Sequence, residues 1–113
     1  QKVLGSTNGQ TSTAAGSCGG SFTDDVVYEL RRRTPSITNM EVNLPTGQTS
    51  YDSLLHVRTQ CGSSNTEVGC NDVSGNGGEQ LNLLFNMNDT RFMWVDGDQQ
   101  ASGSYALTVT PSP

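Results

Sequence analysis

Residues 26–30 read Val-Val-Tyr-Glu-Leu, and this stretch sets the pattern for the rest of the chain. Successive side chains of an extended strand point to opposite faces, so Val26, Tyr28 and Leu30 share one face while Val27 and Glu29 share the other. Such alternation predicts a half-buried β-strand. The same pattern recurs in residues 40–44, 55–58, 81–85, 92–95 and 105–109.

These six segments are separated by turn-rich sequence, and the part of the chain before residue 22 has room for one or two weaker strands. No window carries a helical stripe, so the sequence predicts an all-β sandwich, in which each sheet buries its apolar face on another layer. Periodicity alone leaves jelly-roll and immunoglobulin-like strand orders open. The Cys-Trp-Cys order of immunoglobulin domains is absent, because Trp94 follows the cysteines.

The composition fits one small domain. The chain has 113 residues, of which 32% are hydrophobic and 15% charged, and Gly, Ser, Thr, Asn and Gln are abundant. These residues favour turns over helices. We expect a single domain over residues 1–109, with a loop-rich segment at 1–21 and the start of a proline-containing linker or tail at 110–113.

The charge balance excludes some partners. Six Lys and Arg stand against eleven Asp and Glu, for a net charge of −5. We expect no nucleic-acid binding, because that depends on neutralising phosphates. Nor do we expect membrane insertion, because no apolar run approaches about 20 residues. The one basic run, at residues 31–33, is read as a solvated strand end, with an anionic docking patch as the alternative.

The chain has three cysteines. Cys61 and Cys70 bracket a polar, turn-rich stretch that can fold back on itself, which predicts a disulfide between them. Zinc is the weaker alternative, because a structural zinc ion needs four ligands and the chain offers only three cysteines and the isolated His56. Cys18 is then left over, as a buried thiol or as a partner for a cysteine elsewhere.

Enzymatic signals are weak. His56 is the only histidine, it falls on the polar face of its predicted strand, and no serine lies in a Gly-x-Ser-x-Gly context. We therefore read His56 as an exposed strand residue and predict no catalytic residues and no enzyme activity. Tyr51 and Trp94 are the aromatic candidates for ligand binding. Residues 88–90, Asn-Asp-Thr, fit the N-glycosylation pattern, a three-residue pattern that is common by chance.

Acidic and amide side chains gather at predicted strand ends. Asp52, Asn71 and Asp72 come together if the strand after Asp52 begins where the loop between the cysteines ends, and such oxygens suit calcium. Residues 96–98, Asp-Gly-Asp, are instead typical of a hairpin turn.

Several pieces together resemble a known family. They are residues 17–20 (SCGG), 25–30 (DVVYEL), 52–58 (DSLLHVR), 70–72 (CND), 94–97 (WVDG) and 102–109 (SGSYALTV). In this order they resemble the bacterial pre-peptidase C-terminal domains, which are related to the collagen-binding domains of clostridial collagenases.

The resemblance implies a non-catalytic, jelly-roll-like antiparallel β-sandwich of about seven to eight strands. It also points to Asp24 and Asp25 as a competing calcium position, although residues 5–20 lack the acids of the family's linker. We therefore predict an accessory binding module of a secreted or cell-surface bacterial protein, which binds other domains of its parent protein, a polysaccharide or a matrix protein. The alternative is a self-associating structural or filament subunit.

Overall fold

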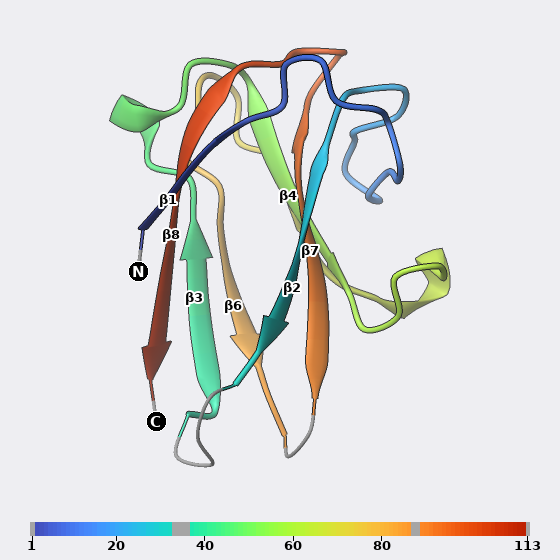
Figure 1. The fold of residues 1–113 in the computed structure, drawn as a ribbon, viewed down its shortest axis with the longest axis vertical. Helices are drawn as coiled ribbons and strands as arrows, with labels where there is room; N and C mark the ends of the chain where they lie inside the picture. The colour runs from blue at the N-terminus through green and yellow to red at the C-terminus, as the bar shows by residue number, and fades with distance from the viewer. Residues whose placement is uncertain (1, 33–36, 87–88, 113) are drawn as a thin grey trace.

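The computed structural model describes residues 2–32, 37–86 and 89–112, and this part of the chain forms two four-stranded sheets (Figure 1). The first sheet has the order β1 (Lys2–Ser6), β8 (Ser104–Ser112), β3 (Asn39–Asn43) and β6 (Gln80–Leu84). The second has the order β2 (Val26–Arg31), β7 (Thr90–Gly97), β4 (Ser53–Arg58) and β5 (Glu67–Asn71). Two short 3₁₀ turns, η1 (Thr46–Gln48) and η2 (Ser64–Thr66), lie in loops.

All neighbouring strands are antiparallel, and the chain crosses between the two sheets at almost every connection. This order is that of a jelly roll, which confirms the predicted fold class. No helix in the described part of the chain is long and apolar enough to cross a membrane. β8 extends to Ser112 and pairs with β3, so residues 110–112 belong to the sheet rather than to the linker that the sequence predicted.

The core lies between the sheets and uses the alternation seen in the sequence. From β4 and β7, Leu55, Val57, Met93 and Val95 point inward and are completely buried. The other parity of the same strands, which in a simple sandwich would face water, is buried as well: every residue of β4 lies out of solvent. Something therefore covers the outer face of the second sheet.

That cover is the segment 11–23, which the sequence predicted to be a loop with almost nothing to bury. Its backbone contacts the residue just before β2: the Thr11 carbonyl accepts a hydrogen bond from the Asp25 amide at 3.2 Å. Gly16 passes so close to the sheet that a Cβ there would lie 2.7 Å from both Cys70 Sγ and His56 Cβ. The segment thus adds a partial third layer over β4 and β7, and this layer makes the site described next.

Candidate functional site

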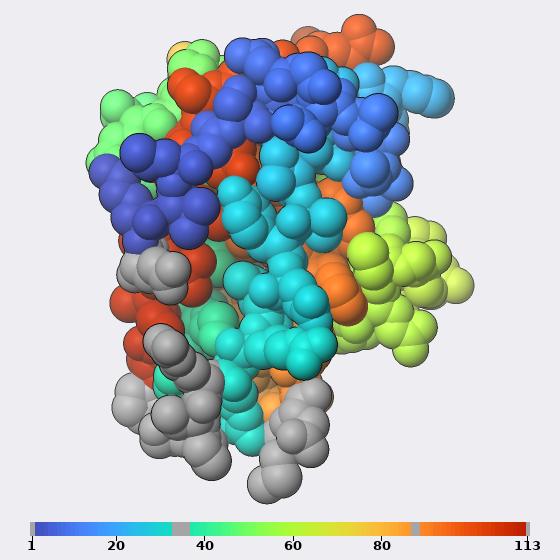
Figure 2. Space-filling model, viewed as in Figure 1, coloured from blue at the N-terminus to red at the C-terminus, as the bar shows by residue number. Residues whose placement is uncertain are grey.

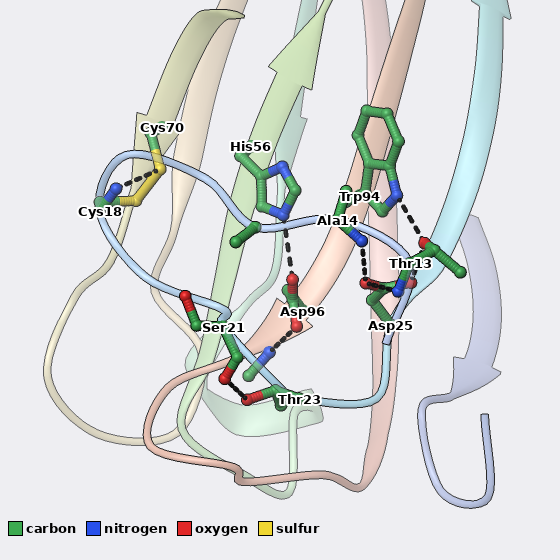
Figure 3. A network of polar contacts seen from close by, with 12 residues as sticks. Thr13, Ala14, Cys18, Ser21, Thr23, Asp25, His56, Cys70, Trp94 and Asp96 are labelled. Carbon is green, nitrogen blue, oxygen red and sulfur yellow. Dashed lines mark hydrogen bonds and ion pairs between the residues drawn. A yellow bond between two sulfur atoms is a disulfide. The ribbon is translucent and has the colours of Figure 1, made fainter. Parts of the chain in front are cut away.

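Under the segment 11–23 lies a buried pair, His56 of β4 and Asp96 of β7 (Figure 3). His56 Nε2 is 3.0 Å from Asp96 Oδ2, and neither side chain has any exposed surface. Burial raises the pKa of Asp96 to about 6, and the hydrogen bonds from His56 and from the Gly97 amide oppose that rise. The expectation of an exposed strand histidine is therefore wrong, because it ignored the third layer.

Trp94 of β7 lies beside His56 on the covered face of the second sheet. Its ring stacks on His56 with the centroids 5.3 Å apart and the planes 11° from parallel, and the Arg58 guanidinium lies 5.0 Å from the Trp94 centroid. The indole Nε1 donates to Thr13 Oγ1 at 3.1 Å. Arg58 also donates to the Ala15 carbonyl at 3.2 Å. These contacts hold the segment 11–23 onto the sheet.

Asp25 is the anchor of that segment. Its carboxylate accepts hydrogen bonds from the Thr13 amide (2.9 Å), the Thr13 hydroxyl (2.6 Å) and the Ala14 amide (3.1 Å). Both carboxylate oxygens are thus engaged by donors of the chain itself, and the side chain is buried. Of the competing calcium position at Asp24 and Asp25, the Asp25 carboxylate is therefore already engaged by donors of the chain itself.

The disulfide joins Cys18 to Cys70, with Cα atoms 5.9 Å apart, and Cys61 is a free, exposed thiol. The predicted Cys61–Cys70 disulfide is wrong. β4 and β5 form a hairpin in which Arg58 pairs with Glu67, so Cys61 lies in the turn while Cys70 lies three residues further along β5. That offset is about 10 Å of strand. The thiol that reaches Cys70 comes from the covering segment instead.

The two aromatic candidates for ligand binding are both core residues. Trp94 is 2% and Tyr51 5% exposed, so neither offers a surface to a ligand. Burial raises the pKa of the Tyr51 phenol far above its usual range. Glu79, also buried, accepts hydrogen bonds from Ser53 Oγ and from the Val73 amide, and burial raises its pKa.

Three carboxylates meet at one end of the second sheet. Asp52 precedes β4, while Asp72 and Asp98 follow β5 and β7, and antiparallel pairing places the start of β4 beside the ends of both neighbours. One oxygen from each carboxylate lies within 4.8 Å of the others. The sequence predicted Asp52 and Asp72 here, but it missed Asp98, which it assigned to a turn. Asn71 instead donates through Nδ2 to the Gln80 carbonyl at 2.9 Å.

Two of the three carboxylates, those of Asp52 and Asp72, are incompletely hydrogen-bonded by the described part of the chain. Oδ1 of Asp52 and Oδ1 of Asp72 are buried, and neither has a hydrogen-bond partner among the described residues. Partial burial, together with the negative charge of Asp98, raises the pKa of Asp52 and of Asp72. Buried oxygens without donors, next to like charges, favour a bound cation.

Phe22 is the residue that the sequence analysis missed altogether. It lies in the loop between Gly20 and Thr23, its side chain is 87% exposed, and its φ is +57°, in the left-handed region that bulky residues avoid. The loop is held on both sides: Cys18 is bonded to Cys70, and Thr23, whose hydroxyl donates to the Ser21 carbonyl, is buried. The fold thus holds a strained aromatic residue out in solvent.

Arg33 and Asn88, named in the sequence analysis, lie outside the described residues.

No protein-family model and no curated protein sequence matches the chain. Among solved structures, the pre-peptidase C-terminal domain of a collagenase from Bacillus anthracis is similar, with a TM-score of 0.57 and 13% identity over 97% of this chain and 88% of that one. A periplasmic inhibitor of g-type lysozyme from Aeromonas hydrophila is also similar, with a TM-score of 0.54 and 16% identity over 97% and 85% of the two chains. At these identities the likeness shows a shared fold, and it agrees with the resemblance seen in the sequence.

Proposed function

We propose that this chain is a non-catalytic binding module of an exported protein, and that the loop carrying Phe22 is its contact surface. The exposure and the backbone strain of Phe22 carry this proposal. A residue held at positive φ costs free energy that the fold must offset, and such outliers concentrate at functional positions. Exposed aromatic residues on rigid supports are also typical anchors of binding surfaces.

Two further observations support a module without catalysis. A general base must come within hydrogen-bond reach of its substrate, and the only histidine is sealed beneath the segment 11–23. The disulfide between Cys18 and Cys70 supports an extracytoplasmic location, because disulfides persist in oxidising compartments.

The test measures binding of the purified chain to a glycan array and to immobilised matrix proteins, including collagen. We expect binding that Phe22→Ala abolishes and that Leu84→Ala preserves, since Leu84 is a similarly exposed apolar residue, on β6. Binding equally strong in Phe22→Ala would reject the Phe22 surface. The panel includes g-type lysozyme, because a protein of this fold inhibits it.

We also propose that Asp52, Asp72 and Asp98 bind one calcium ion. Calcium takes six to eight oxygen ligands at about 2.3–2.6 Å, so two of its ligands can lie up to about 5 Å apart. The three carboxylates fit that spacing, and the buried oxygens of Asp52 and Asp72 need a partner. The bound ion would fasten together the ends of β5 and β7 and the start of β4.

Thermal melting with millimolar calcium against chelator tests the site. We expect calcium to raise the midpoint in the natural chain, in Asn71→Ala and in Asp24→Asn, and to leave it unchanged in Asp98→Asn. Saturation at about a hundred times the dissociation constant adds roughly 2.7 kcal/mol to the free energy of unfolding. A calcium response that survives Asp98→Asn, or none in the natural chain, would remove this proposal.

A further inference from the structure

The outer edge of β2 is open. β2 is the last strand of its sheet and pairs only with β7. Among the described residues, no hydrogen bond reaches the outward-facing amides and carbonyls of Val26–Arg31. An edge of this kind is a template for another strand, and proteins usually block it with a charge, a proline, a bulge or a covering loop.

Two of the other three edges are blocked. On β6, Arg91 donates to the Leu84 carbonyl at 2.8 Å and Asn71 to the Gln80 carbonyl at 2.9 Å. β5 carries a register shift and is bonded through Cys70 to the covering segment. β1, the remaining edge, begins with Lys2, which is its only charge.

A groove of about 340 Å³ lies along the open edge, between β2 on one side and β8 with β1 on the other. Figure 2 shows this face, where atoms of β8 are visible between β1 and β2. Its wall is largely apolar and includes Val3, Tyr28, Leu30, Ile37 and Leu107. Val27, on the opposite face of β2, is 44% exposed. Apolar surface along an unpaired edge gives an added strand something to pack against.

The charges of β2 select a second copy of the same strand as the occupant. Glu29 and Arg31 point to the same exposed face, where they form an ion pair of 2.5 Å within one chain. If two copies pair antiparallel about a two-fold axis at Leu30, each Glu29 lies opposite Arg31 of the partner subunit. Opposite charges directly across from each other stabilise an antiparallel pair, and like charges destabilise it.

Shifting the axis by one residue removes this advantage. An axis at Glu29 places two glutamates face to face, and an axis at Tyr28 places Glu29 opposite Val27 of the partner subunit. The Leu30 register also keeps the segment 11–23, which contacts the start of β2, at the outer ends of the pair.

We propose that two copies of this chain associate through the C-terminal half of β2, antiparallel and centred on Leu30, so that residues 28–32 of the two copies face each other and the two four-stranded sheets join edge to edge. This is a closed, isologous interface, so it yields a dimer rather than a filament. The proposal is independent of the binding surface at Phe22 and of the calcium position, and both lie elsewhere on the molecule.

Sedimentation velocity across a concentration series tests the dimer with a charge exchange. We expect the natural chain to shift from one to two copies as its concentration rises. Glu29→Arg and Arg31→Glu should each weaken association about tenfold or more, because two symmetric attractions become repulsions. The double exchange should restore it, and Lys2→Glu on β1 should change nothing. A chain that stays monomeric at every concentration, or a dimer indifferent to the single exchanges, would overturn the proposal.

Cross-linking tests the register. In a Cys61→Ser background, Leu30→Cys should form a disulfide-linked dimer under mild oxidation, because directly opposite residues have Cα atoms about 4.5–5.5 Å apart. Val26→Cys is the matched control: in this register its two copies lie about 27 Å apart along the strands. Efficient cross-linking by Val26→Cys, or none by Leu30→Cys, would contradict the Leu30 axis.

Discussion

Some single side chains hold several elements of this fold together, and His56 is the clearest case. It is stacked on Trp94, hydrogen-bonded to Asp96 and enclosed by the segment 11–23. One imidazole thereby joins two strands and the covering layer. Its alternation with apolar neighbours matches that of an exposed residue, so the pattern along the strand could not reveal its burial.

His56→Ala is expected to destabilise the chain by about 3–5 kcal/mol. The substitution leaves the buried Asp96 carboxyl without its partner and removes the ring that packs on Trp94. Urea unfolding followed by tryptophan fluorescence measures the loss. Gln48→Ala, at an exposed position in η1, is the control and should stay within about 0.5 kcal/mol of the natural chain. A loss below about 1 kcal/mol for His56→Ala would show that the pair contributes little.

The positive φ of Phe22 is expected to lower the stability of the chain. Phe22→Gly should be more stable than Phe22→Ala by about 1 kcal/mol, because only glycine adopts a φ of +57° without a steric penalty. Both variants lose the aromatic ring, so the difference isolates the backbone. Chemical denaturation of the two variants side by side measures it. Equal stability would mean that the loop relaxes once the ring is removed.

At the scale of elements, the strands were largely predictable and their covering was not. The six alternating segments correspond to β2, β3, β4, β6, β7 and β8, because period-two burial is a local property of a strand. β5, with its mixed Glu-Val-Gly-Cys-Asn sequence, has no such signal and forms because β4 offers it a partner.

The covering segment and the disulfide depend on contacts that are distant in sequence. Thr13, Gly16 and Cys18 reach Asp25, His56 and Cys70, and their own composition is that of a loop. Proximity along the chain favoured Cys61 as the partner of Cys70, while the fold brings Cys18 there across 52 residues. In the acidic cluster, Asp52 and Asp72 were predictable because Asp52 precedes a predicted strand and Asp72 follows the loop between Cys61 and Cys70.

Opening the disulfide is expected to loosen the segment 11–23 before the sandwich. Cys18→Ser in combination with Cys70→Ser should lower the free energy of unfolding by about 4 kcal/mol, the loop-entropy value for a separation of this length. Hydrogen exchange should speed up mainly in residues 11–23, with β4 and β7 less affected. Cys61→Ser, which removes the free thiol, should change neither quantity. Uniform acceleration across the chain would mean that cover and sandwich unfold together.

For the whole molecule, the acidic groups make stability depend on pH. Four buried or partly buried carboxyls, Asp52, Asp72, Glu79 and Asp96, have raised pKa values, and that of Asp96 is about 6. A carboxyl with a raised pKa binds its proton more tightly in the folded chain. Its contribution is fully present below its unfolded pKa and is lost as the pH rises through the folded value. Asp89 has a lowered pKa, but it lies at the surface and opposes this trend only at lower pH.

Without calcium, the free energy of unfolding is therefore expected to fall as the pH rises from about 4.5 to about 7. Calcium should flatten this slope, because the ion stabilises the ionised forms of Asp52 and Asp72 and makes their deprotonation favourable in the folded chain.

Asp96→Asn should remove the part of the slope near pH 6 whether calcium is present or not, since Asp96 lies under the covering segment and outside the carboxylate cluster. Urea titrations at several pH values, with calcium and with chelator, separate the two contributions. Stability that rises steadily with pH in chelator would contradict the raised pKa values. A slope indifferent to calcium would place the ion, if it binds, away from Asp52 and Asp72.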